Sequence, residues 1–345
     1  MLKITKLSNK KDVYDISVEN NHNFYANGIL IHNCEVLHPT KPIESLDDDD
    51  AEIGVCCLSA INLLQTDFDE YEEICDITVR LLDELIDYQD YALPAAENFC
   101  TNRRSLGIGV TNLAGLFAKS KINYDSQEAL ELADKVGEYM SYYCIQSSMN
   151  LAKEKGECKK NKYNMGEFPI DRANKNALKL TNRPFELDWE SLRAEIQENG
   201  VRNSTLLAIM PAESSSVIQN STNGIEPIRS LLAFKESKNG ILKQLAPNLK
   251  RYGKYYTLAW DIKDNTCLNN ISAVLQKWID MGISTNHYYN YAHYEGGNIP
   301  LSRIIKDMIY AYKVGVKTLY YANTPDGSAE MIPNNSSCDS GACAI

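Results

Sequence analysis

The 345-residue sequence lacks several features that would place it at once in a broad class of proteins. No apolar run reaches the roughly 18 residues that a membrane-spanning helix needs, and the first residues lack the apolar core of a signal peptide. The net charge of −11 argues against a surface that coats nucleic acid, but not against a small nucleotide in a local pocket. We therefore expect a cytoplasmic protein with neither a membrane nor a nucleic acid as its partner.

Ten cysteines are present, but they form no Cys-x-x-Cys and no Cys/His cluster at zinc spacing. Without a secretion signal, thiols or redox pairs are favoured over a disulfide framework, and no metal site is predicted. The acidic run Asp47–Asp50 is interpreted as a solvated loop rather than as a metal site. With 44% apolar and 23% charged residues, the chain has an ordinary globular composition and enough length for two domains.

The tripeptide His32-Asn33-Cys34 has the chemistry of a self-cleaving junction. The side-chain amide of Asn33 can attack its own main-chain carbonyl, His32 can assist the leaving nitrogen, and the thiol of Cys34 can accept an acyl group. A chance tripeptide is the alternative. Residues 12–28 favour the junction, because they supply a strand, an isolated histidine at His22, an aromatic residue and a turn glycine.

Residues 12–34 resemble the last two sequence blocks of inteins, which fold as a compact all-β horseshoe. The resemblance implies that His22 assists splicing and that the three junction residues carry it out. A complete intein also needs an N-terminal nucleophile block, for which the residues before the junction leave no room. We therefore expect residues 1–33 to be the C-terminal segment of a split intein. This segment would be excised when Cys34 is joined to an upstream half that carries the N-terminal intein segment.

Apolar periodicity predicts helices in the remainder of the chain at residues 67–90, 104–119, 126–155, 188–198, 267–282 and 300–315. Buried strands are predicted at residues 52–60 and 205–210, and a further strand at residues 317–321, between the last helix and the tail. This alternation predicts an α/β fold with a parallel layout, such as a barrel. Gly107-Ile108-Gly109 lacks the third glycine of a dinucleotide-binding fingerprint and is interpreted as a site of helix packing. Residues 325–345 are polar, without apolar periodicity, and are predicted to be a flexible tail.

The stretch from Pro211 to Ser216 directly follows the predicted strand 205–210. Backbone amides and hydroxyl groups at such a point can cradle a phosphate. An equally good interpretation is a helix cap, in which Ser214 to Ser216 satisfy the amides of the first turn.

Two further pairs of residues can carry redox chemistry. Tyr320 and Tyr321 are adjacent in a predicted strand, where neighbours normally point to opposite faces, so one core and one surface tyrosine is the ordinary expectation. A redox-active pair is the functional alternative. Cys338 and Cys343 lie in the polar tail, where two thiols can close a disulfide. We favour a redox shuttle over a weakly held metal for them.

Taken in order, these strings resemble the C-terminal half of the large (alpha) subunit of class I ribonucleotide reductases. The strings that carry the resemblance are Glu35-Val-Leu-His-Pro-Thr-Lys-Pro, Glu52-Ile-Gly-Val-Cys-Cys-Leu-Ser-Ala, Asn102-Arg-Arg-Ser-Leu-Gly-Ile-Gly-Val, Arg202-Asn-Ser-Thr-Leu, Met210-Pro-Ala-Glu-Ser-Ser-Ser, Thr222-Asn-Gly-Ile-Glu-Pro, Val316-Lys-Thr-Leu-Tyr-Tyr and Cys338-x4-Cys343. The resemblance implies a ten-stranded α/β barrel with a finger loop, of which residues 34–324 would be the C-terminal part. It also implies a reaction that replaces the ribose 2′-hydroxyl of a nucleoside diphosphate by hydrogen.

The resemblance assigns roles near the junction position by position. Glu35 matches the glutamate that takes the proton of the substrate 3′-hydroxyl, a task that suits a desolvated carboxylate. Cys34 does not align with the thiyl-radical cysteine, which would belong to the upstream half. Cys56 matches one of two barrel cysteines that reduce the substrate, and its partner would also lie upstream. Cys57 is one position off and is less favoured.

The resemblance also assigns roles to the three features described above. The loop that holds the substrate diphosphate is matched by Ala212, Glu213, Ser214 and Ser215. Ala212 replaces a residue that often bears a hydroxyl, so one side-chain contact would be missing. Tyr320 and Tyr321 match the tyrosines that relay the radical from the small subunit. Cys338 and Cys343 match the pair that reduces the barrel disulfide and is reduced in turn by thioredoxin or glutaredoxin.

The implied protein is an enzyme precursor in deoxyribonucleotide biosynthesis that is inactive alone. It would need its upstream half and a small (beta) subunit that carries the metal and tyrosyl radical, and it would hold no cofactor itself. Split inteins are common in phage reductase genes, so the cytoplasm of a phage-infected bacterium is the expected location. Two alternatives remain: a non-catalytic fragment that associates without ligation or modulates another reductase, and a stand-alone thiol redox protein.

Overall fold

The computed structural model describes residues 23–26, 29–32, 48, 50–160, 167–237 and 240–325. The chain divides into two compact units, residues 1–35 and 36–345. Each unit is described by itself.

The first unit contains a short β-hairpin. Strands β1 (Asn23–Ala26) and β2 (Ile29–His32) are antiparallel, with Asn23 opposite His32 and Ala26 opposite Ile29. Asn27 and Gly28 separate the strands, and an Asn-Gly pair between short strands is a strong hairpin signal. This unit therefore contains two short strands next to the predicted junction.

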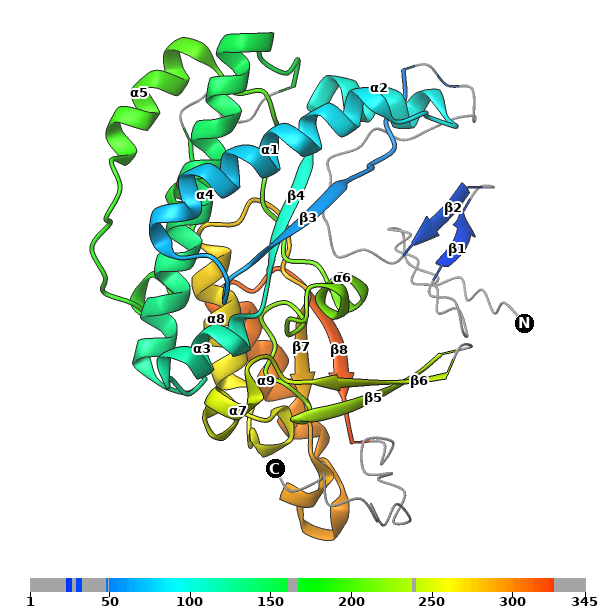
Figure 1. The fold of residues 1–345 in the computed structure, drawn as a ribbon, viewed down its shortest axis with the longest axis vertical. Helices are drawn as coiled ribbons and strands as arrows, with labels where there is room; N and C mark the ends of the chain where they lie inside the picture. Colours follow the sequence, from blue (N-terminus) through cyan, green and yellow to red (C-terminus); the bar gives the residue numbers. More distant parts are fainter. Residues whose placement is uncertain are drawn as a thin grey trace. The chain divides into compact units, whose positions relative to one another are not determined.

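The second unit is built around a parallel sheet in which neighbouring segments follow one another in chain order (Figure 1). In the described part of the chain these segments are β3 (Cys57–Asn62), β4 (Leu106–Thr111), residues 205–210, β7 (Thr285–Tyr288) and β8 (Leu319–Asn323). Residues 205–210 join the sheet through two parallel bridges, Ile108 to Leu207 and Ile209 to Ile283. The described strands do not close into a barrel, because β3 and β8 pair on one side only. The α/β class and the parallel layout are confirmed.

Helices connect the sheet segments, and most of the apolar core lies between these helices and the sheet. The helices are α1 (Tyr71–Tyr88), α2 (Pro94–Arg103), α3 (Leu113–Ser120), α4 (Gln127–Lys155), α5 (Trp189–Asn199), α6 (Glu213–Ile218), α7 (Leu249–Tyr252), α8 (Thr266–Gln276) and α9 (Leu301–Val314). Helix α4 packs against α1 and α8, and α8 packs against α9. An antiparallel hairpin of β5 (Leu232–Ser237) and β6 (Gly240–Leu245) stands apart from the parallel sheet.

Most of the predicted elements are confirmed, with shifted ends. Predicted helices 67–90, 126–155, 188–198 and 300–315 correspond to α1, α4, α5 and α9. The predicted helix 267–282 ends early, at Gln276. Residues 205–210 are buried as predicted, and the other two predicted strands begin later, at Cys57 and Leu319. Helix α2, the β5–β6 hairpin and β7 were not predicted.

The predicted helix 104–119 is wrong over its first half, which is strand β4. A Cβ atom on Gly107 would lie 2.5 Å from Leu58 Cδ2, and one on Gly109 would lie 2.6 Å from the carbonyl oxygen of Ala208. The two glycines therefore let β4 pack closely against the segments on both sides of it. Helix packing was the wrong interpretation of these glycines.

Candidate functional site

The predicted phosphate loop lies at the start of α6, directly after the buried segment 205–210. Glu213, Ser214 and Ser215 are exposed there, whereas Ala212 is buried. The helix-cap interpretation does not hold, because Ala212 is the N-cap residue and no side chain caps the first turn. The hydroxyl of Ser216 instead donates to the carbonyl oxygen of Glu213 at 3.0 Å. The first-turn amides of a helix have no acceptor within their own helix, and no side chain caps those of α6.

The amide of Ala212 is already engaged within the protein. It donates a hydrogen bond of 2.7 Å to Oδ1 of Asn223. This amide is therefore not a donor for a bound diphosphate, and the lost side-chain contact at Ala212 is not replaced by its main chain.

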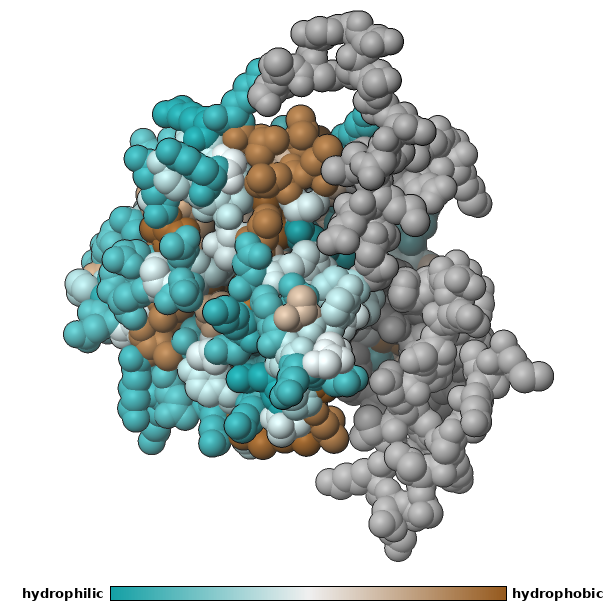
Figure 2. Space-filling view, turned by 90° about the horizontal axis from the view of Figure 1, so that it is seen from below, coloured by the Kyte–Doolittle hydropathy of each residue, from teal (hydrophilic) through white to brown (hydrophobic). Residues whose placement is uncertain are grey.

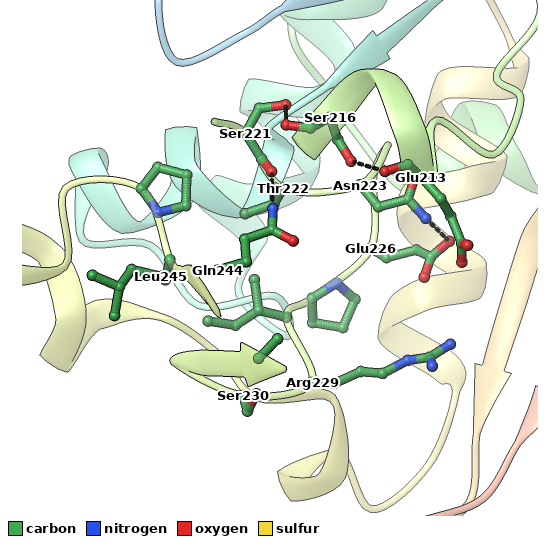
Figure 3. Close-up of a pocket in the computed structure, with 15 residues that line it drawn as sticks. Glu213, Ser216, Ser221, Thr222, Asn223, Glu226, Arg229, Ser230, Gln244 and Leu245 are labelled. Atoms are coloured by element: carbon green, nitrogen blue, oxygen red, sulfur yellow. Dashed lines mark hydrogen bonds between the residues drawn. The ribbon is translucent and has the colours of Figure 1, made fainter. Parts of the chain in front are cut away.

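A cleft of roughly 170 Å³ opens beside this loop (Figure 3). It is lined by the start of α6, by residues 221–230 and by the end of β6. In Figure 3, Asn223 and Glu226 point toward one another and Arg229 extends alongside them. The guanidinium group of Arg229 also donates to Oδ1 of Asn323, in β8, at 3.1 Å. The cleft is thus lined by hydroxyl groups, by the cation of Arg229 and by the carboxylates of Glu213 and Glu226, whereas Ser214 and Ser215 do not line it.

Tyr320 and Tyr321 lie ring against ring, although they are neighbours in β8. Their ring centroids are 3.9 Å apart and the ring planes are inclined by 44°. The reason is an irregular register: Thr285 pairs with Leu319, but His287 pairs with Ala322. Between these two pairs β8 advances by three residues and β7 by two, so β8 contains one extra residue. An extra residue of this kind changes the direction of the neighbouring side chains. The ordinary expectation of one core and one surface tyrosine is wrong.

Asn286 of β7 lies opposite this irregularity. Its Oδ1 accepts the backbone N–H of Tyr321 at 2.9 Å, and its Nδ2 donates to Oε1 of Glu226 at 2.7 Å. The carboxylate of Glu226 also accepts the hydroxyl of Tyr288, and Nδ2 of Asn223 donates to it at 3.4 Å. Burial raises the pKa of Glu226. Sequence reasoning singled out neither carboxylate nor amide, since only the fold brings these side chains together.

The two adjacent cysteines have different surroundings. Cys57 begins β3, packs against the core and accepts a hydrogen bond from Nε2 of Gln89 at 3.8 Å. Burial raises the pKa of its thiol. Cys56 directly precedes β3 and, like Cys57, is partly buried.

Several predicted site residues lie outside the described residues, namely His22, Asn33, Cys34, Glu35, Cys338, Cys343 and the side chain of His32. Among the residues that are described, no three His, Cys, Asp or Glu side chains are grouped to hold a metal ion. The helices described here include none with the length and apolar character needed to cross a bilayer.

A family model for the barrel domain of ribonucleotide reductases matches residues 17–322. The chain belongs to the ribonucleotide reductase family. The match begins before residue 33, so the predicted boundary between intein and reductase segments depends on the sequence motif alone. The parallel sheet and its flanking helices are then part of the reductase barrel domain.

Curated relatives carry the description "Ribonucleoside-diphosphate reductase subunit alpha". The chain is 45% identical over 316 residues to the relative from Haemophilus influenzae and 43% identical over 321 residues to that from Buchnera aphidicola of Acyrthosiphon pisum. Both alignments cover 90% of this chain and 42% of the relative. The relative from Enterobacteria phage T4 is 40% identical over 303 residues, which are 86% of this chain and 39% of that protein. The chain thus spans about two fifths of the length of these reductase subunits.

Proposed function

We propose that this chain is the C-terminal half of a ribonucleoside-diphosphate reductase large subunit. Joined to an upstream half, it would reduce ribonucleoside diphosphates to 2′-deoxyribonucleoside diphosphates by thiyl-radical chemistry. The observation that carries the proposal is the ring contact between Tyr320 and Tyr321, with centroids 3.9 Å apart and planes inclined by 44°, in a barrel domain of this family. Adjacent strand residues do not bring their rings into contact without a special register, so the pairing is a built feature.

In the proposed mechanism, the half-exposed Tyr321 receives the radical from a small subunit and passes it to Tyr320. At each step a phenol loses an electron and its proton. The radical then reaches the cysteine that the upstream half supplies, and the resulting thiyl radical takes the 3′-hydrogen of the ribose and returns it at the end of the cycle. Glu35 takes the proton of the substrate 3′-hydroxyl, and the 2′-hydroxyl accepts a proton from a barrel cysteine thiol and leaves as water. Cys56 and its upstream partner supply the two reducing equivalents and become a disulfide.

The substrate diphosphate is proposed to bind at the first turn of α6. The amides of Glu213, Ser214 and Ser215 and the two serine hydroxyls would hold it, with the positive end of the helix facing the charge. Exposure of these residues and the lack of a side-chain cap support this assignment.

Uncovered apolar surface supports the need for an upstream half. Among the described strands, β3 pairs along one edge only, and its Leu58 is exposed. Helix α1, which follows β3, also presents an apolar row to solvent, made of Ile77, Leu81, Leu85 and Tyr88. Apolar patches of this kind mark interaction sites, and the relatives are more than twice as long as this chain. We assign this surface to the upstream half of the subunit.

A second apolar row lies on α9 and is assigned to the small subunit. It consists of Leu301, Ile305, Met308, Ile309 and Tyr312, all exposed. Helix α9 leads within a few residues into β8, so a partner bound there lies next to the strand of Tyr321. Figure 2 shows that apolar surface on the displayed face gathers in patches rather than as single residues.

The proposal is tested by reconstitution. The chain is ligated to its upstream half, mixed with a metal-bearing small subunit and a dithiol, and formation of deoxyribonucleoside diphosphate is measured by chromatography. We expect turnover only when all three parts are present. Lack of product from the complete assembly would refute the proposal, and dithiol turnover by this chain alone would favour the stand-alone redox protein.

Replacing both tail cysteines, Cys338→Ser with Cys343→Ser, is expected to limit the ligated enzyme to about one reduction per active site when thioredoxin is the reductant. Dithiothreitol should restore continued turnover, because a small thiol reaches the barrel disulfide without a tail. Single-turnover and steady-state product counts give the measurement. The control is Ser337→Ala, which keeps both thiols. Continued turnover of the double variant with thioredoxin would remove the shuttle role.

A further inference from the structure

Asn286 connects three segments that are far apart in the sequence. It is 7% exposed and belongs to β7, between the two residues of β7 that pair with β8 on either side of the irregularity. Its amide oxygen accepts the Tyr321 N–H at 2.9 Å, and its amide nitrogen donates to Glu226 at 2.7 Å. The irregular register leaves the Tyr321 amide without its regular strand partner, and the Asn286 side chain replaces that partner.

The connection continues from Glu226 to the phosphate loop. Nδ2 of Asn223 donates to Oε1 of Glu226 at 3.4 Å (Figure 3). Oδ1 of Asn223 accepts the amide of Ala212 at 2.7 Å. Four hydrogen bonds thus lead from the N-cap of α6 to the backbone of Tyr321. Asn223 and Asn286 each use both their amide oxygen and their amide nitrogen, and both donate to Oε1 of Glu226, so a displacement at one end of the network acts on every bond in it.

The two hydrogen bonds that residue 286 makes in this network require a primary amide at that position. A primary amide carries both a donor and an acceptor, so it can serve the N–H of Tyr321 and the carboxylate of Glu226 at once. Aspartate would keep the first bond and set a second carboxylate against Glu226. Alanine would leave both buried groups without this partner, and an unsatisfied buried polar group costs about 1–3 kcal/mol.

We propose that Asn286 is a positioning residue that holds the rings of Tyr320 and Tyr321 in contact and couples this geometry to occupancy of the phosphate loop. The inference rests on the proposed function of the tyrosine pair and of the loop. A diphosphate bound at residues 213–215 contacts the residues next to Ala212, and Asn223, Glu226 and Asn286 pass the resulting shift to the Tyr321 backbone. Coupling of this kind requires that the ligand favours one arrangement of the network over another.

The test uses the ligated large subunit with difluorotyrosine in place of Tyr321, observed by fluorine NMR with and without a ribonucleoside diphosphate. In the otherwise unchanged protein, we expect the nucleotide to shift the fluorine resonance. Asn286→Ala should move or broaden the resonance and remove the response to nucleotide. Asn286→Asp, of nearly the same shape, should keep the resting resonance and lose the response, because only the bond to Glu226 is broken.

Turnover of the same variants, made with natural tyrosine, gives a second measurement. We expect kcat to fall by about tenfold or more while KM changes by less than about threefold. The control is Asn290→Ala. The Asn290 side chain also makes two hydrogen bonds to the main chain: its Oδ1 accepts the Ala292 N–H at 3.0 Å, and its Nδ2 donates to the Trp260 carbonyl oxygen at 2.9 Å. It lies outside the network. It should change neither the fluorine response nor kcat.

The outcomes separate this inference from the proposed function. If the unchanged assembly makes no deoxyribonucleotide, or if Tyr321→Phe remains active, the proposed function fails. If the assembly is active and Tyr321→Phe is not, but both Asn286 variants keep the fluorine response and kcat, then only the positioning role is overturned.

Discussion

Replacing Tyr321 by phenylalanine is expected to lower turnover of the ligated reductase by at least about 10³-fold while substrate still binds. Phenylalanine keeps the ring and therefore the contact with Tyr320, whose centroid lies 3.9 Å away. It has no phenolic O–H, so it cannot lose an electron and a proton to become a phenoxyl radical. The relay would be interrupted at its first residue in this chain, without a change in shape.

The measurement compares kcat with the dissociation constant of the nucleoside diphosphate, determined by equilibrium binding. Tyr291→Phe is the matched control, because Tyr291 is 44% exposed, against 42% for Tyr321, and lies outside the pair. We expect the control to retain turnover. A Tyr321→Phe enzyme with unchanged kcat would remove the relay role, and weaker substrate binding would indicate a structural defect instead.

Replacing Asn33 by alanine is expected to abolish release of residues 1–33 from the precursor. The Asn33 amide is the group that attacks its own carbonyl, and a methyl group cannot perform this attack. The strands β1 and β2 directly precede this residue, in keeping with the short strands that an intein segment requires. The measurement is intact mass after co-expression with the upstream half.

The unchanged chain should give a ligated product that lacks residues 1–33. A tryptic peptide with a cysteine directly before Cys34-Glu35 would establish the register of the active site as well. Asn9→Ala serves as the control and should splice normally. Ligated product from the Asn33→Ala chain would contradict the assignment. An unchanged chain that keeps residues 1–33 beside a bound partner would mean that the reductase works as two pieces.

The elements that the sequence predicted well are those with a local apolar period. Helices α1, α4 and α9 each bury one face and show that period over several turns. Strand β4 was missed because it is buried on both faces, so its apolar run shows no alternation, and its glycines seemed to belong to a helix. Strand β7 is also buried throughout, but most of its side chains are polar, so no run of apolar residues marks it in the sequence.

The candidate site likewise has features that a local stretch of sequence predicts and features that depend on the tertiary structure. The strings around Cys56, Pro211 and Tyr320 are local, so they could be recognised in sequence, and with them the phosphate loop and the tyrosine pair. The ring contact of Tyr320 with Tyr321 could not be predicted, because it results from the pairing of β8 with a strand more than thirty residues earlier. The role of Asn286 was likewise invisible, since its partners are 60 residues before it and 35 residues after it.

By itself, the sequence determined the α/β class, the order of most helices, the family and the chemical groups available for reaction, because each depends on residue type and short spacing. The tertiary structure alone decided which amide of the loop is engaged and how the tyrosines meet. The physical reason is that strand register and buried hydrogen bonds join segments distant in the chain. Their energies depend on which groups the fold leaves without water, and no local pattern contains that information.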